Sequence, residues 1–197
     1  MATTSPIKVT ARDEMARGRF LSLNQLNWID AKGITRKWEA VERLGDFRAV
    51  MIIPRLVPSG RMVLIKQYRP PAGGWVVEFP AGILNPDEEP SSGAARELRE
   101  ETGFIARDIL VFPPSFTSPG MSNESIFTAV VNIDETLPEN IHRHTEFDPG
   151  EMIETILVTD SELDVFYRKQ AVEGVRFDSK LVTYIIALGC VAGNDKS

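Results

Sequence analysis

The N-terminal part of the chain changes from a polar stretch to an alternation of apolar and polar residues. Residues 1–14 are mostly polar and follow no period, which is typical of an arm without regular structure. Between Phe20 and Asp30 apolar residues recur at roughly every second position, and a turn signal ending at Gly33 leads into a second stretch, ITRKWEAVER. This pattern predicts a small β-hairpin domain at residues 15–45.

The middle of the chain contains short apolar stretches separated by turn residues. The breaks at 58–60 and 69–74 contain the proline and glycine that turns favour, and a long polar loop is expected at 133–150. Each apolar stretch has the length of a strand. The predicted strands are 47–56, 61–68, 75–82, 104–112, 125–133 and 151–158.

One helix is predicted in the middle of the chain and two near its end. Pro90 favours a first helical turn, Gly103 suits the position after the last turn, and residues 94–102 are mostly strong helix formers. Residues 179–190 carry apolar side chains at helical spacing, and a further helix is expected at about 160–171. Many strands with a central helix and late helices predict an α+β fold in which helices pack on a mixed sheet.

Length and charge limit the kind of partner. The 197 residues are enough for a core without disulfides, and the net charge of −6 disfavours a nucleic-acid partner. No apolar stretch approaches the roughly 18 residues of a membrane helix, and the N-terminus lacks the apolar segment of a secretory signal. We therefore expect a cytoplasmic protein without a membrane partner, with the single cysteine, Cys190, in the core.

Three glutamates lie close together on the central predicted helix. Glu97, Glu100 and Glu101 are three and four residues apart, so their carboxylates share one side of the helix. One interpretation is a solvated helix face on which Arg96 and Arg99 are the partners. The other is a cation site, because clustered carboxylates repel one another and supply the hard oxygen ligands of a divalent ion.

A longer pattern around these glutamates favours the second interpretation. A glycine, a glutamate, the run Arg-Glu-apolar-x-Glu-Glu and a Gly-apolar pair occur at fixed spacing, and this segment resembles a complete Nudix box. With average residue usage, a chance match at one start position is on the order of 10⁻⁹. The positions that match are Gly82, Glu88, Arg96, Glu97, Leu98, Glu100, Glu101, Gly103 and Phe104.

The resemblance implies a metal site built from this box. Its glutamates would bind Mg²⁺, with Mn²⁺ as the alternative, and the backbone carbonyl just before the box is a ligand in similar enzymes. Glu97 and Glu101 would be the principal ligands. The implied metal-binding residues are Ala81, Glu97, Glu100, Glu101 and Glu151.

Other residues of the box would support the site without taking part in chemistry. Arg96 would pair with a box glutamate, and Glu88 is the natural candidate, whose role is then to hold the loop. Gly82 and Gly103 would serve backbone geometry, since glycine permits positive φ and close approach of other groups.

Segments outside the box resemble the ADP-ribose pyrophosphatase branch of the Nudix superfamily. The run VLIKQYRPPAGGWVVEFPAG is similar to the segment before the box in these enzymes, and Pro119 lies where this branch carries a proline. The start GRFLSL, followed by TRKWEAVER, resembles the N-terminal part of nucleoside diphosphate sugar hydrolases. Ser118 stands where some relatives have an acidic residue and others have serine.

The same resemblance implies a set of substrate-binding residues. Aromatic side chains at positions 20 and 38 would stack on the purine, although Phe20 replaces a tryptophan of some relatives. The alternative is that Phe20 and Trp38 belong to the core or to a dimer interface. Arg69 suits the diphosphate, because a guanidinium matches phosphate oxygens. The implied set is Phe20, Trp38, Glu39, Arg43, Arg69, Ile83 and Ser118.

A catalytic base is expected on a loop beyond the box. Glu151 follows Pro149-Gly150 and precedes a predicted strand, which fits the placement in the family best; Glu154 and Glu146 are alternatives. His142 and His144 lie in the same loop, but a His-x-His in a loop is more often a solvated feature. The implied catalytic residues are Glu151, Glu101 and Glu97.

For the whole chain the resemblance implies a Nudix α/β/α sandwich at 46–197, preceded by the small β domain, in a homodimer. The implied reaction is Mg²⁺-dependent hydrolysis of a nucleoside diphosphate sugar, with ADP-ribose giving AMP and ribose 5-phosphate. The alternatives are another nucleotide substrate (ADP-glucose, GDP-mannose, NADH or an oxidised nucleotide), a non-catalytic module that binds ADP-ribose, and an RNA-cap hydrolase.

Overall fold

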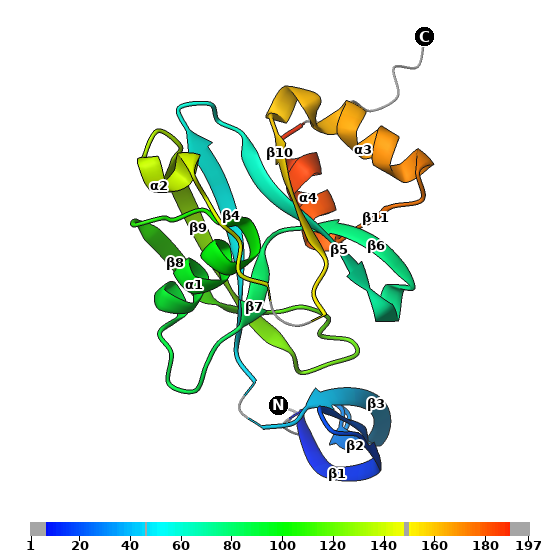
Figure 1. Ribbon diagram of the computed structural model, residues 1–197. Coiled ribbons are helices and arrows are strands. Elements are labelled where there is room, and N and C mark those ends of the chain that lie inside the picture. Colours follow the sequence, from blue (N-terminus) through cyan, green and yellow to red (C-terminus); the bar gives the residue numbers. More distant parts are fainter. Residues whose placement is uncertain (1–6, 46, 148–149, 190–197) are drawn as a thin grey trace, which may run out of the picture. The chain divides into compact units, whose positions relative to one another are not determined.

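The computed structural model describes residues 7–45, 47–147 and 150–189, and the chain divides into two compact units (Figure 1). One unit contains Met1–Arg48 and Pro114–Ile126, and the other contains Ala49–Pro113 and Phe127–Ser197. Each unit has its own sheet, so the two are described separately.

The first unit contains a three-stranded antiparallel sheet, formed in order by β1 (Lys8–Arg17), β2 (Leu21–Ile29) and β3 (Thr35–Arg43). β2 and β3 are the predicted hairpin, and Leu26 pairs with Trp38. In the turn between them, the Asp30 carboxylate accepts two backbone N–H groups at 2.9 and 3.0 Å. Gly33 adopts a φ of 77°, which glycine tolerates best.

The expectation that residues 1–14 form an arm without regular structure is wrong for residues 8–14, which belong to strand β1; residues 1–6 lie outside the described part of the chain. The residues of β1 pair along β2 from Lys8, opposite Ile29, to Arg17, opposite Ser22. Every residue of β1 is exposed, so the strand has no buried face whose alternation the sequence could reveal. The regular structure of β1 follows from its backbone pairing with β2.

The second unit is built on an eight-stranded mixed sheet. Its strands are β4 (Ala49–Val57), β5 (Met62–Arg69), β6 (Gly74–Glu78), β7 (Ala81–Ile83), β8 (Ile109–Phe116), β9 (Ser125–Asp134), β10 (Ile153–Val158) and β11 (Arg176–Phe177). The hydrogen-bonded order is β11, β6, β5, β4, β9, β8, while β10 pairs with β5 and β7 with β4. β4 runs parallel to β9 and antiparallel to β5, as a mixed sheet requires.

The helices of this unit are α1 (Pro90–Thr102), α2 (Pro138–Ile141), α3 (Leu163–Val172) and α4 (Ser179–Ala187), with 3₁₀ turns η1 (Pro70–Ala72) and η2 (Asp160–Glu162). The predicted bounds of α1 are confirmed. Pro90 occupies its first turn, and Gly103, at a φ of 74°, donates its N–H to the Arg99 carbonyl at 2.8 Å. α2 and β11 were not predicted, because elements of four and two residues show no period.

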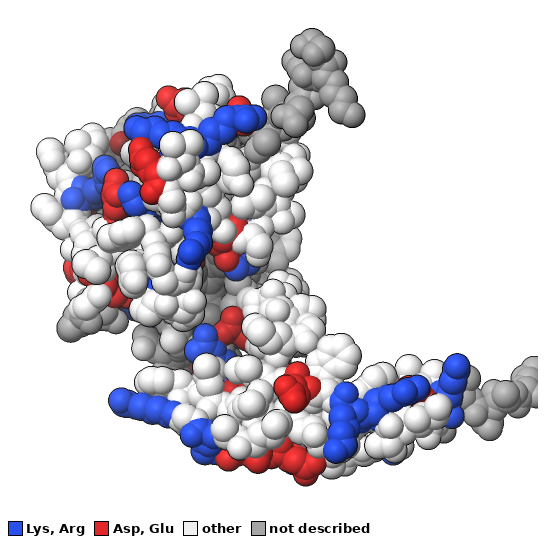
Figure 2. Space-filling model, turned by 90° about the vertical axis from the view of Figure 1, so that its right-hand side faces the viewer, with Lys and Arg blue, Asp and Glu red and all other residues white. Residues whose placement is uncertain are grey.

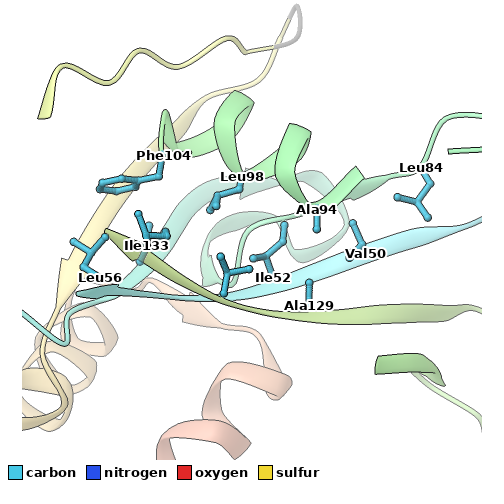
Figure 3. Close-up of a cluster of buried hydrophobic side chains, with 11 residues drawn as sticks. Val50, Ile52, Leu56, Leu84, Ala94, Leu98, Phe104, Ala129 and Ile133 are labelled. Carbon is cyan, nitrogen blue, oxygen red and sulfur yellow. The ribbon is translucent and has the colours of Figure 1, made fainter. Parts of the chain in front are cut away.

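A hydrophobic core fixes α1 on the sheet. Leu98 and Ala94 are fully buried against Val50 and Ile52 of β4, and Phe104 closes the far end of the cluster (Figure 3). On the other side, α4 packs on the sheet through Tyr184, whose ring meets Phe79 edge to face. The α+β sandwich with a mixed sheet and a separate small β sheet is therefore confirmed.

Two further expectations concern membrane helices and the cysteine. Among the helices of the described residues, none has both the length and the apolar character needed to cross a bilayer. The expected core position of Cys190 lies outside the described residues.

Candidate active site

Arg96 of α1 is surrounded by three carboxylates. Its guanidinium donates to both carboxylate oxygens of Glu88 at 2.9 Å, to Glu97 at 2.8 Å and to Glu100 at 2.9 Å. It also donates to the Ile83 carbonyl at 3.0 Å, which joins the loop before α1 to the helix. The hydrogen bonds from Arg96 lower the pKa of Glu88 to about 2. The predicted pair of Arg96 with Glu88 is confirmed, and Arg96 holds two other box glutamates as well.

Glu101 lies deeper than its neighbours on the same helix. It is only 5% exposed, and its carboxylate accepts the N–H of Ala81 at 3.0 Å. Burial raises the pKa of Glu101 to about 9, and the negative charges of Glu97, Glu151 and Glu78 add to that effect. Without a cation, this carboxyl therefore holds its proton at neutral pH.

Glu97 occupies space that only a glycine at position 82 leaves open. A Cβ on Gly82 would lie 1.9 Å from the Glu97 carboxyl carbon, so any other residue would displace that side chain. Burial raises the pKa of Glu97, while its hydrogen bond from Arg96 opposes the shift. The glycine at the start of the box therefore allows the Glu97 side chain to approach the backbone closely. Gly103, at the end of the box, adopts a positive φ.

A cavity of about 530 Å³ gathers several of the predicted residues. Three carboxylates line it from two directions, since two come from α1 and the third from the segment before β10. Glu100 is not among its lining residues and turns instead to Arg96. The chemically relevant lining residues are Arg69, Ala81, Ile83, Arg96, Glu97, Glu101 and Glu151.

The donor groups of this cavity fit a hard divalent cation. Within the ranges that the structure describes, no three carboxylate, imidazole or thiolate groups converge as they would around a bound ion. Arg96 accounts for part of this, because it holds Glu97 and Glu100. Yet Glu97, Glu101 and Glu151 offer only oxygen, and the raised pKa values of the first two reflect burial and mutual repulsion that a cation relieves.

Of the predicted candidates for the base, Glu151 is the one that lines the cavity. Glu154 lies in β10 and is paired with Lys66 at 3.4 Å, with a side chain that is 65% exposed. Glu146 is paired with Arg99 at 3.1 Å. The two histidines of the loop are exposed, so the geometry favours Glu151.

Arg69 enters the same cavity from the end of β5. Its Nε donates to Glu78 at 2.8 Å, which leaves the two terminal nitrogens for a ligand. Sequence reasoning missed Glu78, although a lone glutamate inside the apolar run WVVEF was a usable signal. Glu78 fixes the arginine that the resemblance assigns to the diphosphate.

A second cavity, of about 270 Å³, lies in the first unit on the face of β3 that carries Trp38. The Trp38 side chain is 51% exposed, and its Nε1 donates to the Gly120 carbonyl at 3.0 Å. Pro119 and Met121 form another wall, and Arg12 of β1 also lines the cavity. Arg12 was missed because its segment has no buried face and therefore no alternation that predicts a strand.

Phe20 does not lie beside Trp38. The Phe20 carbonyl accepts the N–H of Leu44, whereas Trp38 is six residues earlier on β3. At about 3.4 Å per residue, the two aromatic residues are about 20 Å apart along the sheet. Phe20 is also absent from the residues that line the Trp38 cavity.

The other predicted substrate residues have the following surroundings. Glu39 is exposed on β3, and Arg43 is paired with Glu124 at 2.7 Å. The Ser118 carbonyl closes a turn by accepting two backbone N–H groups at 2.9 Å. Ile83 is 59% exposed and lines the cavity that also contains Glu97, Glu101 and Glu151.

Comparison with known proteins finds similarity over most of the chain. The model of the NUDIX domain matches residues 46–175. An ADP-sugar pyrophosphatase of Mus musculus is 31% identical over 91% of this chain and 86% of its own length. An ADP-ribose pyrophosphatase of Saccharomyces cerevisiae is 29% identical, over 83% of this chain and 74% of its own length.

Among solved structures, that of an ADP compounds hydrolase superposes with a TM-score of 0.65 at 22% identity, over 83% of this chain and 85% of the other. This likeness supports the fold. The box geometry, the domain match and the relatives together show that the chain belongs to the Nudix hydrolase family, in the branch of the ADP-ribose pyrophosphatases, and is a pyrophosphohydrolase.

Proposed function

We propose that the protein hydrolyses the diphosphate of a nucleoside diphosphate sugar in the presence of a divalent cation, with ADP-ribose as the preferred substrate. The observation that carries this proposal is the catalytic cavity, where Glu97, Glu101 and Glu151 face the same space as Arg69. The products from ADP-ribose are AMP and ribose 5-phosphate. The names of the relatives, which act on ADP-ribose or ADP-sugars, support the choice of substrate.

Glu97 and Glu101 would hold the cation, together with the Ala81 carbonyl. Mg²⁺ is the proposed ion and Mn²⁺ the alternative; when bound, it neutralises the diphosphate and acidifies water nearby. Glu100 joins the set only if it leaves Arg96, to which it is bonded at 2.9 Å.

Glu151 is the proposed base and Arg69 the proposed diphosphate contact. Glu151 takes a proton from the attacking water, whose oxygen forms a bond to one phosphorus while the bond to the bridging oxygen breaks. The other phosphate leaves with the bridging oxygen. Arg69 places its terminal nitrogens on the phosphate oxygens, because Glu78 already occupies its Nε.

The Trp38 cavity is the proposed site for the base. A partly exposed indole held by Gly120 offers a fixed aromatic face on which a purine can stack. Phe20 is too far along the sheet to contact the same base within one chain. If both aromatics hold one purine, they come from two copies, and we therefore propose a homodimer whose sites combine residues of both chains.

The other partners are proposed on charge and composition. Figure 2 shows acidic side chains among the basic ones on the face that it presents, and the net charge is −6, which supports a small substrate over RNA. One cysteine in 197 residues supports a cytoplasmic location.

The experiment that tests the substrate is a panel of nucleotides at equal concentration with Mg²⁺, each product identified by chromatography. We expect the highest kcat/KM for ADP-ribose, with AMP as one product. A higher kcat/KM for GDP-mannose, ADP-glucose, NADH or an oxidised nucleotide would transfer the proposal to that substrate. Absence of turnover on all of them would overturn it.

A further inference from the structure

A third cavity, of about 410 Å³, adjoins the catalytic cavity through a shared arginine. Arg69 lines both cavities, and its partner Glu78 lines this one. Small apolar side chains of η1 and β6 form part of the wall. The polar lining residues are Arg69, Glu78, Arg176, Asp178 and Ser179.

Arg176 of β11 lies on the same side of the sheet as Arg69. Partners in neighbouring strands share a side, and so do residues two apart in one strand. Gln67, two before Arg69, pairs with Val76, and Val76 pairs with Arg176. This side also carries Thr155, whose position opposite Ile65 places it with Gln67 and Arg69. The Thr155 hydroxyl donates to a backbone carbonyl of α1 at 3.5 Å. The side of the sheet that carries Arg69 and Arg176 is therefore the side on which α1 packs.

The Arg176 guanidinium lies beside Gly74 of β6, the strand between β11 and β5. Gly74 is the pairing partner of Arg69. A Cβ added to Gly74 would lie 3.7 Å from a terminal nitrogen of Arg176. The Arg176 guanidinium therefore lies beside the residue that pairs with Arg69, and both arginines line the third cavity.

The charges of this cavity leave Arg176 uncompensated. Glu78 is paired with Arg69 at 2.8 Å, and Asp178 is paired with Lys180 at 2.8 Å. Arg176 makes no ion pair or hydrogen bond within residues 7–45, 47–147 and 150–189. An arginine without a counterion, beside a second arginine, is suited to phosphate oxygens.

We propose that this cavity is a phosphosugar subsite in which Arg176 binds the phosphate of the sugar phosphate product. The inference rests on the proposed function, since hydrolysis of the diphosphate yields two phosphate monoesters, one of them on a sugar. The sugar hydroxyls would meet Ser179 and the carboxylates of Glu78 and Asp178. The volume suits a small ligand of this kind. AMP is expected to bind through its base in the Trp38 cavity and not here.

The first test measures binding in chelator, without turnover. Ribose 5-phosphate, AMP and inorganic phosphate are titrated calorimetrically into the wild type, Arg176→Ala, Arg176→Lys and a control, Arg168→Ala. Arg168 is an exposed arginine of α3 that lines none of these cavities. We expect Arg176→Ala to weaken ribose 5-phosphate binding about 10-fold, as for a lost charge-assisted hydrogen bond, with partial rescue by lysine and no change in the control.

Unchanged affinity for ribose 5-phosphate in Arg176→Ala, or no binding by the wild type, would overturn the subsite. An equal loss of AMP affinity would also contradict it, because a phosphosugar site discriminates between the two monoesters. Inorganic phosphate separates the sources of affinity. If Arg176→Ala loses affinity for both inorganic phosphate and ribose 5-phosphate, Arg176 contacts the phosphate group. If it keeps its affinity for both, that contact is refuted.

The second test separates this inference from the proposed function. In the AMP-release assay, the inhibition constant of ribose 5-phosphate is expected to rise about 10-fold in Arg176→Ala, while that of AMP stays unchanged. If the wild type does not cleave ADP-ribose, the proposed substrate fails, yet the titration in chelator still decides the subsite. If ADP-ribose is cleaved and Arg176→Ala alters neither inhibition constant, the subsite is refuted while the proposed function stands.

Discussion

Neighbouring glutamates of one helix occupy different environments. The spacing predicted that Glu97, Glu100 and Glu101 share a side, and it identified the box. It could not predict that Glu101 is 5% exposed while Glu100 turns to Arg96. That difference depends on the contact of Glu101 with Ala81, the first residue of β7, which lies 20 residues away along the chain. Motif spacing therefore predicts which glutamates lie on one side of the helix, whereas tertiary packing determines the burial and the pKa of each carboxyl group.

Glu101 should make the stability of the metal-free protein depend on pH. Its folded pKa is about 9, against 4.5 as the ordinary value. Between these values the folded state keeps a proton that the unfolded state has lost, so the free energy of unfolding falls as pH rises. We expect the Tm in chelator to drop between about pH 6 and about pH 8.5, and to drop less in Glu101→Gln. Equal pH dependence in both proteins would contradict the protonated state of Glu101.

The choice of base is tested by two matched variants. Glu151→Gln removes the proton acceptor in the cavity and should lower kcat by roughly 10²–10⁴ with KM nearly unchanged. Glu154→Gln removes a carboxylate that is 65% exposed and paired with Lys66, so its kcat should stay near that of the wild type. Steady-state kinetics with ADP-ribose measure both. The reverse ranking would move the role to Glu154 and leave the rest of the mechanism in place.

At the scale of elements, α1 also anchors the loop that precedes β10. The Glu146 N–H donates to the Glu100 carbonyl at 2.9 Å, and its carboxylate pairs with Arg99 at 3.1 Å. A Cβ on Gly103 would come within 3.0 Å of Arg143 and His144 of this loop. Periodicity predicted α1, because one face of the helix is buried. It could not predict a loop held by single polar contacts, nor β1, which has no buried face.

The pair of Arg99 and Glu146 should help to hold the loop that carries Glu151. Arg99→Glu and Glu146→Arg are each expected to lower kcat about 2- to 5-fold, since exposed ion pairs contribute about 0.2–1 kcal/mol. The double variant restores the pair with reversed charges and should recover most of the loss. The cycle is measured with ADP-ribose at saturating Mg²⁺. Additive losses in the double variant would show that the two side chains act independently.

At the scale of the whole molecule, each unit contains a cavity of its own. The second unit holds the acidic cavity, and the first holds the Trp38 cavity. The sequence predicted the sheet of each unit and the box, because burial and spacing leave a pattern. It could not predict the separation of Phe20 from Trp38, which follows from strand register.

The proposed dimer can be tested by mixing two variants. Phe20→Ala and Trp38→Ala should each raise KM for ADP-ribose roughly 5- to 150-fold, the range for a lost stacking contact. If one site combines Phe20 of one chain with Trp38 of the other, each mixed dimer regains one intact site. Co-expression should then restore wild-type KM in about a quarter of the sites. Light scattering checks the assembly; a monomer, or no low-KM fraction on mixing, would refute the shared site.

The most direct test of the central claim is AMP release from ADP-ribose by the wild type and by Glu101→Gln, with Mg²⁺ and with chelator. We predict that the wild type releases AMP and ribose 5-phosphate in equal amounts only when the cation is present. We predict that Glu101→Gln, still folded, loses at least about 10²-fold in kcat at saturating Mg²⁺. Turnover in chelator, or near wild-type turnover by Glu101→Gln, would contradict a cation site on the box glutamates.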